Sequence, residues 1–381
     1  MQSIPTHLAL CLPEIVSHVI SFLDDHQSET TSKYAGRLAS MSVNRLWHDC
    51  TMRAVWRKVE FDDTKEEVMA LQKFASVFSN EYTEQDIFDS SDPTTHDKTK
   101  DRPRETAQIN KIINTSHVIH IDDHVLNDLS PISHVPMYRT TLQSLSLRKI
   151  KYKTIDVPLE KIARHATQLS HLDVYICDYF TNTALSAFLC HRRLTYLSLA
   201  GCYRITDEAI LKVAETCPLL EHLDMRACGL ISDVSVSAIA LSCPGLRHLN
   251  VGRIRERHRI THKSISLIAR HTRAVVLGLA GCDIDDDCML LLAQLRGSLL
   301  ERVSVNNCPR LTNATLHAYV QYCPSLSVFE MKECHQVDDW EAVANLVQRK
   351  VLLTLCDQQN MACTAWARRR GHALEVKAPM K

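Results

Sequence analysis

The chain has 381 residues, of which 45% are hydrophobic and 23% are charged, as in an ordinary globular protein. Its 44 Lys and Arg residues equal its 44 Asp and Glu residues, so no net charge favours nucleic acid or a membrane surface as a partner. Only 9 glycines occur, which argues against a glycine-rich nucleotide loop. Neither a secretory signal nor a membrane span is recognisable, so we expect a cytoplasmic or nuclear protein with reduced thiols.

Residues 8–57 are predicted to form a small all-α module. Pro13 and Glu14 suit the first turn of a helix, because proline needs no amide donor there and an acid complements the helix dipole. The helix has two apolar stripes, one of Ile15, Val19 and Phe22 and one of Val16, Ile20 and Leu23. One stripe can fill the core of the module and the other needs a partner. The pattern leaves open which stripe does which.

This module resembles an F-box, the element through which substrate receptors bind a Skp-type adaptor and, through it, a cullin. The residues that match the family pattern are Pro13, Glu14, Ile15, Leu23, Ser42, Val43, Arg45, Trp47 and Trp56. The resemblance implies an adaptor-binding surface of Leu12, Pro13, Ile15, Val16, Val19, Ile20, Leu38 and Val43. The alternative is that residues 11–57 only cap the open edge of the repeats that follow.

Residues 58–115 are predicted to hold a weak first repeat region. Val59–Phe61 indicates an isolated strand after Trp56. Residues from about 80 to 106 are rich in Asp, Glu, Ser, Thr and Pro and have no apolar period, so we expect a disordered acidic insertion there. A further weak repeat is expected to begin near Ser116.

A segment of the form L-x-x-L-x-L-x-x-C, followed by a polar turn and a helical apolar pattern, recurs along the rest of the chain. It starts at Leu142, Leu169, Leu194, Leu220, Leu246, Ala274, Leu300 and Leu326, in steps of 25 to 28 residues. Paired strands lie about 4.8 Å apart whereas packed helices need about 8–10 Å, so stacking bends the array with its strands inside. We therefore predict an α/β horseshoe solenoid over residues 116–355, with residues 356–381 as a C-terminal cap and basic tail.

The pattern resembles the cysteine-containing class of leucine-rich repeats. Ten of the 15 cysteines occupy two repeat positions: the ninth (Cys177, Cys202, Cys228, Cys282, Cys308, Cys334) and the helix end (Cys190, Cys217, Cys243, Cys323). A free cysteine packs as a small hydrophobe, so we expect structural thiols. No C-x2-C pair is present to hold zinc, and we expect neither a metal nor a cofactor.

The third, fifth and seventh positions of the L-x-x-L-x-L-x-x-C motif lie on its strand and are predicted to face away from the core. Our candidate target-binding residues on this concave face are His171, Asp173, Tyr175, Tyr196, His222, Asp224, Arg226, His248, Asn250 and Arg302. A mixture of aromatic, imidazole and charged side chains suits protein recognition. The alternative is that an exposed strand face is simply polar.

Three further motifs each have two interpretations. The basic run Arg253–Arg259 favours an acidic or phosphorylated partner segment, but it also fits a solvated loop. The four aspartates between Asp283 and Asp287 resemble cation ligands, but they lie at the turn where other repeats hold Thr-Asp, so we expect helix caps. Arg368–Arg370 is either a nuclear signal or an ordinary helix end.

No H-E-x-x-H, G-x-S-x-G or G-x-x-x-x-G-K-[ST] motif is present, so we expect no enzymatic activity. The resemblances imply a substrate receptor of a Skp/cullin/F-box ubiquitin ligase that binds an unknown protein target on its repeats. The alternative is a non-enzymatic scaffold or inhibitor similar to the antagonist of mitotic exit family, which binds and blocks a cell-cycle regulator. We expect neither nucleic acid nor a membrane as a partner.

Overall fold

The computed structural model describes residues 12–22, 39–79, 138–371 and 374–379. The described residues fall into two compact units. The first is drawn from the chain up to Ser146 together with Val157–Leu169, and the second comprises Leu147–Asp156 and Ser170–Lys381. The expected acidic insertion and the weak repeat near Ser116 lie outside the described residues.

The strands of the described residues form one sheet in which their order follows the chain. They are β1 (Lys58–Asp62), β2 (Ser144–Arg148), β3 (His171–Tyr175), β4 (Tyr196–Ser198), β5 (His222–Asp224), β6 (His248–Asn250), β7 (Val276–Gly278), β8 (Arg302–Ser304), β9 (Val328–Glu330) and β10 (Leu352–Thr354). Every neighbouring pair from β3 to β10 is parallel. The strand expected at residues 59–61 is β1.

Helices alternate with the strands, as the repeat pattern predicts. The first unit contains α1 (Pro13–Ser21), α3 (Arg45–Arg57), α4 (Lys65–Ser79) and nearly all of α8 (Asp156–His165). The second unit contains α9 (Asn182–Phe188), α10 (Asp207–Thr216), α11 (Asp233–Ser242), α12 (His262–His271), α13 (Asp286–Arg296), α14 (Asn313–Tyr322), α15 (Trp340–Gln348) and α16 (Asp357–Arg369). Two short 3-10 turns, η5 (Leu189–His191) and η6 (Arg257–Arg259), complete it.

The first unit has a small core between α1 and α3. Val16 and Ile20 of α1 are fully buried and pack with Cys50 of α3, and the partly buried Leu46 and Trp47 complete the cluster. Further along α3, the ring of Trp56 lies in a separate aromatic cluster with Phe61, Phe74, Phe78 and Tyr138. The helix predicted to begin at Pro13 therefore uses one of its two apolar stripes for its own core.

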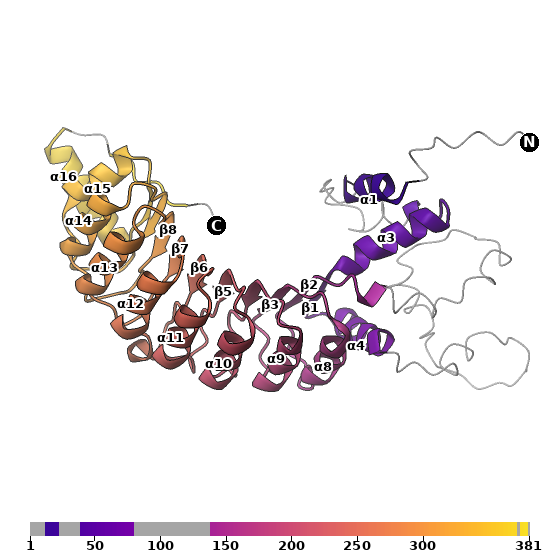
Figure 1. Ribbon diagram of the computed structural model, residues 1–381. Helices are drawn as coiled ribbons and strands as arrows, with labels where there is room; N and C mark the ends of the chain where they lie inside the picture. The colour runs from indigo at the N-terminus through magenta and orange to yellow at the C-terminus, as the bar shows by residue number, and fades with distance from the viewer. Residues whose placement is uncertain (1–11, 23–38, 80–137, 372–373, 380–381) are drawn as a thin grey trace, which may run out of the picture. The chain divides into compact units, whose positions relative to one another are not determined.

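The second unit is an α/β leucine-rich-repeat solenoid, as predicted. Within it, strands β3 to β10 line the inner side of an arc and the helices α9 to α15 lie on the outer side (Figure 1). The fourth motif position is buried throughout: Leu172, Leu197, Leu223, Leu249, Leu277, Val303 and Phe329 lie in one row, each paired with the next. Burial of this row fixes the strand register, because a shift by one residue would expose it.

Cysteines at the ninth position link each repeat to the one before it. The Sγ of Cys202 donates to the carbonyl of Val174 at 3.4 Å, and the Sγ of Cys228 donates to that of Leu199 at 3.1 Å. Burial raises the pKa of Cys228 and Cys282 to about 12, so both stay protonated as thiols. One expectation is wrong: Cys190, grouped with the helix-end cysteines, is exposed because it lies in the η5 turn beyond α9.

Aspartates at the first position of several helices bind the cap of the following helix. The carboxylate of Asp207 accepts from the amide of Ser232 at 2.8 Å and from the hydroxyls of Ser232 and Ser235 at 2.6 and 2.5 Å. Asp233 and Asp286 make the same set of bonds to the next repeat. Each carboxylate thus joins adjacent repeats on the helix side.

Candidate protein-binding site

Four rings lie next to one another on the inner face of the solenoid. Strand register pairs His171 with Tyr196, Tyr196 with His222, and His222 with His248. Successive ring centroids are 3.7, 4.0 and 3.8 Å apart, and successive planes are within 28° of parallel. We call these four residues the ring column. Each ring comes from the third motif position, so the repeat itself aligns them.

The environment of the ring column keeps Tyr196, His222 and His248 uncharged at neutral pH. Burial lowers the pKa of His222 to about 3, and the charges of His248, His171 and Arg226 act in the same direction. Burial also lowers the pKa of His248 and raises that of Tyr196. Tyr196, His222 and His248 therefore offer phenol and imidazole edges that can donate or accept hydrogen bonds without carrying a positive charge.

Arg226 is held beside the ring column by Asp224. The carboxylate of Asp224 accepts from the backbone amide of Arg226 at 3.0 Å and from its Nε at 3.2 Å, and it lies 2.9 Å from Nη2. Asp224 was expected to face outward as a candidate target-binding residue, but only 6% of it is exposed. Its role is to orient Arg226, whose side chain remains half exposed.

The other predicted residues of this face lie around the column. Asp173 pairs with Arg148 at 3.4 Å, and Tyr175 is half-buried at the end of β3. The side-chain oxygen of Asn250 accepts from the amide of Gly252 at 3.1 Å. Arg302 is separated from the column by β7 and pairs with Glu330 at 2.7 Å. The structure therefore groups the candidates of β3 to β6 and leaves Arg302 outside the group.

A second candidate surface lies on α1 in the first unit. Its members are Leu12, Ile15, Val19 and Phe22, which are 45%, 38%, 36% and 58% exposed. We call these four residues the α1 apolar face. Two of the expected adaptor contacts, Val16 and Ile20, are not exposed on this face, because they are fully buried against α3.

Three other predicted members of the adaptor surface have different positions. Pro13 is exposed at the start of α1, and Val43 is 58% exposed just before α3. Leu38 lies outside the described residues. Phe22 was not among the predicted adaptor contacts, although its spacing from Ile15 and Val19 is the signal that could have found it.

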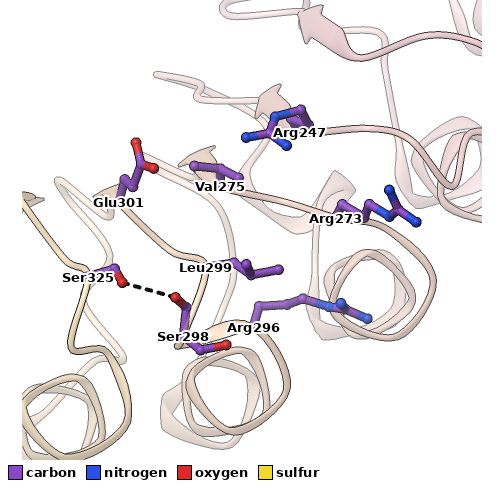
Figure 2. A pocket seen from close by; sticks show the side chains of 8 residues that line it. All are labelled: Arg247, Arg273, Val275, Arg296, Ser298, Leu299, Glu301 and Ser325. Carbon is purple, nitrogen blue, oxygen red and sulfur yellow. Dashed lines mark hydrogen bonds between the residues drawn. The ribbon is translucent and has the colours of Figure 1, made fainter.

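A pocket of about 440 Å³ opens at the edge of the second unit where β7 and β8 begin (Figure 2). It is lined by Arg247, Arg273, Val275, Arg296, Ser298, Leu299, Glu301 and Ser325. Arg296 donates through Nε to the carbonyl of Ala269 at 2.6 Å and through Nη2 to that of Arg270 at 3.1 Å, so it caps the end of α12. The lining offers neither a carboxylate pair nor a histidine or cysteine.

The aspartates at the start of α13 act as structural groups. Asp285 caps the helix by accepting from the amide of Cys288 at 3.1 Å, and Asp286 binds the cap of α14. Asp283 and Asp285 also pair with Arg310 at 3.0 and 2.8 Å. Within the part of the chain that the structure describes, no group of three His, Cys, Asp or Glu side chains could hold a metal ion.

None of the helices in the described ranges combines the length and the apolar composition that a bilayer-crossing segment needs.

Comparison with solved structures gives distant matches. The crystal structure of the Rad7 and Elc1 complex in yeast has 15% sequence identity and a TM-score of 0.37, with 60% of this chain and 71% of that chain covered. An internalin C2 from Listeria monocytogenes has 15% identity and a TM-score of 0.39, with 58% and 83% covered. No protein-family model matches the chain.

Curated proteins give closer matches in sequence. Antagonist of mitotic exit network protein 1 from Yarrowia lipolytica is 32% identical over 327 residues, which cover 84% of this chain and 42% of that protein. The protein of the same name from Eremothecium gossypii is 26% identical over 360 residues, which cover 92% of this chain and 76% of that protein. The chain thus spans less than half of the Yarrowia relative. It is similar in sequence to proteins named as antagonists of the mitotic exit network.

Proposed function

We propose that this chain is a non-enzymatic receptor that binds a protein partner on the inner face of its repeats. The ring column is the observation that carries the proposal. Its four rings are stacked on one another, and Asp224 orients Arg226 beside them. Side chains that are already ordered lose little entropy on binding, and aromatic and arginine side chains dominate the energy of many interfaces.

The similarity to Antagonist of mitotic exit network protein 1 supports a regulatory version of this proposal. In this version the partner is a regulator of mitotic exit, and the chain blocks it by occupying the surface that the regulator needs. No bond is made or broken by the chain. The protein acts in the cytoplasm, the nucleus or both, where cell-cycle regulators are found.

A second candidate function is substrate capture for a Skp/cullin/F-box ubiquitin ligase. The observation that favours it is the α1 apolar face, which is exposed although Val16 and Ile20 of the same helix fill a core. In this candidate the face binds a Skp-type adaptor, and through it a cullin, while the repeats hold the target. The contribution of the chain is then proximity, because tethering raises the effective concentration of the target near the conjugating enzyme.

The first experiment tests the inner face with Tyr196→Ala combined with Arg226→Ala in the full chain. We expect this variant to lose about 2–3 kcal/mol of binding free energy for the protein that co-purifies with the wild type. The matched control is Val276→Ala combined with Val328→Ala, which changes the same face beyond the ring column. Equal loss of affinity in the two variants would contradict the proposal, and so would full binding by the first.

The second experiment separates the two candidate functions. Ile15→Asp combined with Val19→Asp places two charges on the α1 apolar face, and Val234→Asp places one on the exposed surface of α11 as a control. If the ligase candidate is right, the wild type and the control retain a purified Skp-type adaptor in a pull-down and the α1 variant does not. A wild-type chain that retains no adaptor would rule out this candidate and leave the inhibitory scaffold.

A further inference from the structure

The row of ninth-position cysteines is interrupted at one repeat of the second unit. In the flanking repeats, Cys228 and Cys282 are buried and their thiols donate to carbonyl oxygens of the preceding repeat. In the interrupted repeat the ninth position is Ile254, which is 82% exposed. Ile254 is the second residue of the basic run Arg253–Arg259, and we call this run the rim loop. An apolar side chain is thus turned outward where its equivalents are buried.

Arg253 anchors the first end of the rim loop inside the solenoid. It is only 6% exposed, and its Nη1 and Nη2 each donate to the carbonyl of Ile231 at 3.3 Å. Nη1 also donates to the carbonyl of Glu256 at 3.2 Å, which ties the two sides of the loop together. Glu256 adopts a left-handed conformation with φ of 54° directly before η6.

The following repeat is adapted to the rim loop. A Cβ added to Gly281 would lie 2.0 Å from the carbonyl oxygen of Arg253, so only glycine fits at that position. Arg257 donates through Nη2 to the side-chain oxygen of Asn307 at 2.7 Å, and its own carbonyl accepts from the amide of Asp283 at 3.3 Å. The loop is therefore held by two later repeats, which argues against a merely solvated loop.

Besides the buried Arg253, two guanidinium groups of the rim loop have no carboxylate partner among the described residues, those of Arg255 and Arg257. The carboxylate of Glu256 lies 3.7 Å from Nε2 of His258 and 3.9 Å from Nε of Arg259, so it pairs with these two side chains. Within the described part of the chain, Arg255 has neither an ion-pair partner nor a hydrogen-bond partner, and the side-chain partner of Arg257 is a neutral amide. The loop thus presents two uncompensated positive charges next to an exposed isoleucine.

We propose that the rim loop binds an acidic segment of a protein partner. Arg255 and Arg257 pair with carboxylates of that segment, and Ile254 contacts an apolar side chain next to them. Arginine and carboxylate groups form charge-assisted, two-pronged hydrogen bonds, and insertions in single repeats commonly map to binding loops. Two guanidinium groups without a carboxylate partner, in a chain with no net charge, are too few for the several phosphate contacts that nucleic acid binding uses.

This proposal does not depend on the ring column, and the test keeps the two apart. A display library of random 12-residue peptides is selected on the immobilised full chain and, separately, on Ile254→Ser combined with Arg255→Ser. The control is Arg270→Ser, which removes an exposed charge at the other end of the same repeat. We expect peptides with Asp or Glu next to Leu, Ile or Phe to be enriched on the wild type and the control, and to be lost on the double variant.

The recovered peptide is then measured by fluorescence anisotropy. We expect about tenfold weaker binding to the double variant, about 1.4 kcal/mol, and unchanged binding to Tyr196→Ala. Arg257→Lys tests the hydrogen bond from Arg257 to Asn307 while it keeps the positive charge. We expect it to weaken peptide binding less than the double variant does. Both altered side chains of the double variant are exposed, so its melting temperature should equal that of the wild type.

Four results would overturn the proposal. The first is equal recovery of acidic peptides on the wild type and the double variant. The second is binding only when a phosphoserine replaces the acidic residues, which would assign the loop to a phosphate group. The third is tighter binding of a single-stranded RNA that depends on Arg255. The fourth is loss of peptide binding in Tyr196→Ala, which would place the peptide on the inner face.

Discussion

Strands β3 to β6 and strands β7 to β10 are built on the same buried row but differ on the face that they present. At the third motif position the first four strands carry His171, Tyr196, His222 and His248, whereas the last four carry Val276, Arg302, Val328 and Leu352. On the inner face of the described second unit, stacked rings therefore occur only on strands β3 to β6. The fold does not require them, because the other half folds in the same way without them.

This difference separates the residues that make the solenoid from those that give it a specific surface. A buried leucine in either half is needed to pack strand on helix, so its identity is restricted. An outward side chain is not restricted by packing of the core. Four successive rings at that position therefore need an explanation other than folding. The proposed binding of a protein partner would supply that explanation.

The largest effect is expected in the shared core. Leu223→Ala in β5 and Leu277→Ala in β7 each remove a fully buried side chain, so each should lower the free energy of unfolding by about 2–5 kcal/mol. Urea unfolding followed by circular dichroism measures this, with Leu295→Ala, which is 44% exposed, as the control. If only one of the two variants lost free energy of unfolding, the two halves would not be stabilised by the same buried row.

Low pH should reduce the stability of the protein through the half that contains the ring column. The folded pKa of His222 is about 3 and lies below its ordinary value of 6.5, so the unfolded chain binds a proton between these values while the folded chain does not. Stability should therefore fall as the pH drops from about 6.5 towards 3. His222→Gln should lose less stability than the wild type between pH 7 and pH 4.5, as measured by urea unfolding at the two pH values.

The control for this prediction is His335→Gln, which removes an exposed histidine outside the ring column. It should leave the pH dependence of the wild type unchanged. Equal pH dependence in the wild type and in His222→Gln would show that the stacked rings do not oppose protonation of His222.

The smallest effect on stability is expected for the one exposed cysteine of the repeat series. Cys190 should react with a maleimide well before Cys202 and Cys308, which are fully buried, and mass spectrometry of the labelled peptides would show the order. Cys190→Ser should leave the melting temperature unchanged, and so should dialysis against a strong chelator. Faster labelling of Cys202 than of Cys190, or zinc in the purified protein, would contradict the structural role of the buried thiols.

The repeat period was sufficient to predict the strands, the helices and the aligned third positions, because each is repeated several times in register. Asp224 shows where that reasoning fails. Alternation along a strand places it outward, but it accepts hydrogen bonds from Arg226 and only 6% of it is exposed. The hydrogen bonds that Ser232 and Ser235 donate to Asp207 were also missed, since they depend on how one helix end meets the next.

In the helical module the sequence contained two equally apolar stripes on one helix. Packing against Cys50 selects Val16 and Ile20 for the core, and only the arrangement of α1 and α3 reveals that choice. The rim loop was visible as a basic run, but the inward turn of Arg253 and the outward turn of Ile254 follow from hydrogen bonds to Ile231 that no local pattern encodes.

The most direct test of the central claim is hydroxyl-radical footprinting of the full chain, free and in complex with the protein that co-purifies with it. Histidine and tyrosine are both oxidised readily, so Tyr196, His222 and His248 can be followed together, with His317 and Tyr322 of α14 as controls on the helix side. The account predicts that complex formation protects the ring column and leaves the controls unchanged. Protection of α14 with no change at Tyr196, His222 and His248 would contradict it.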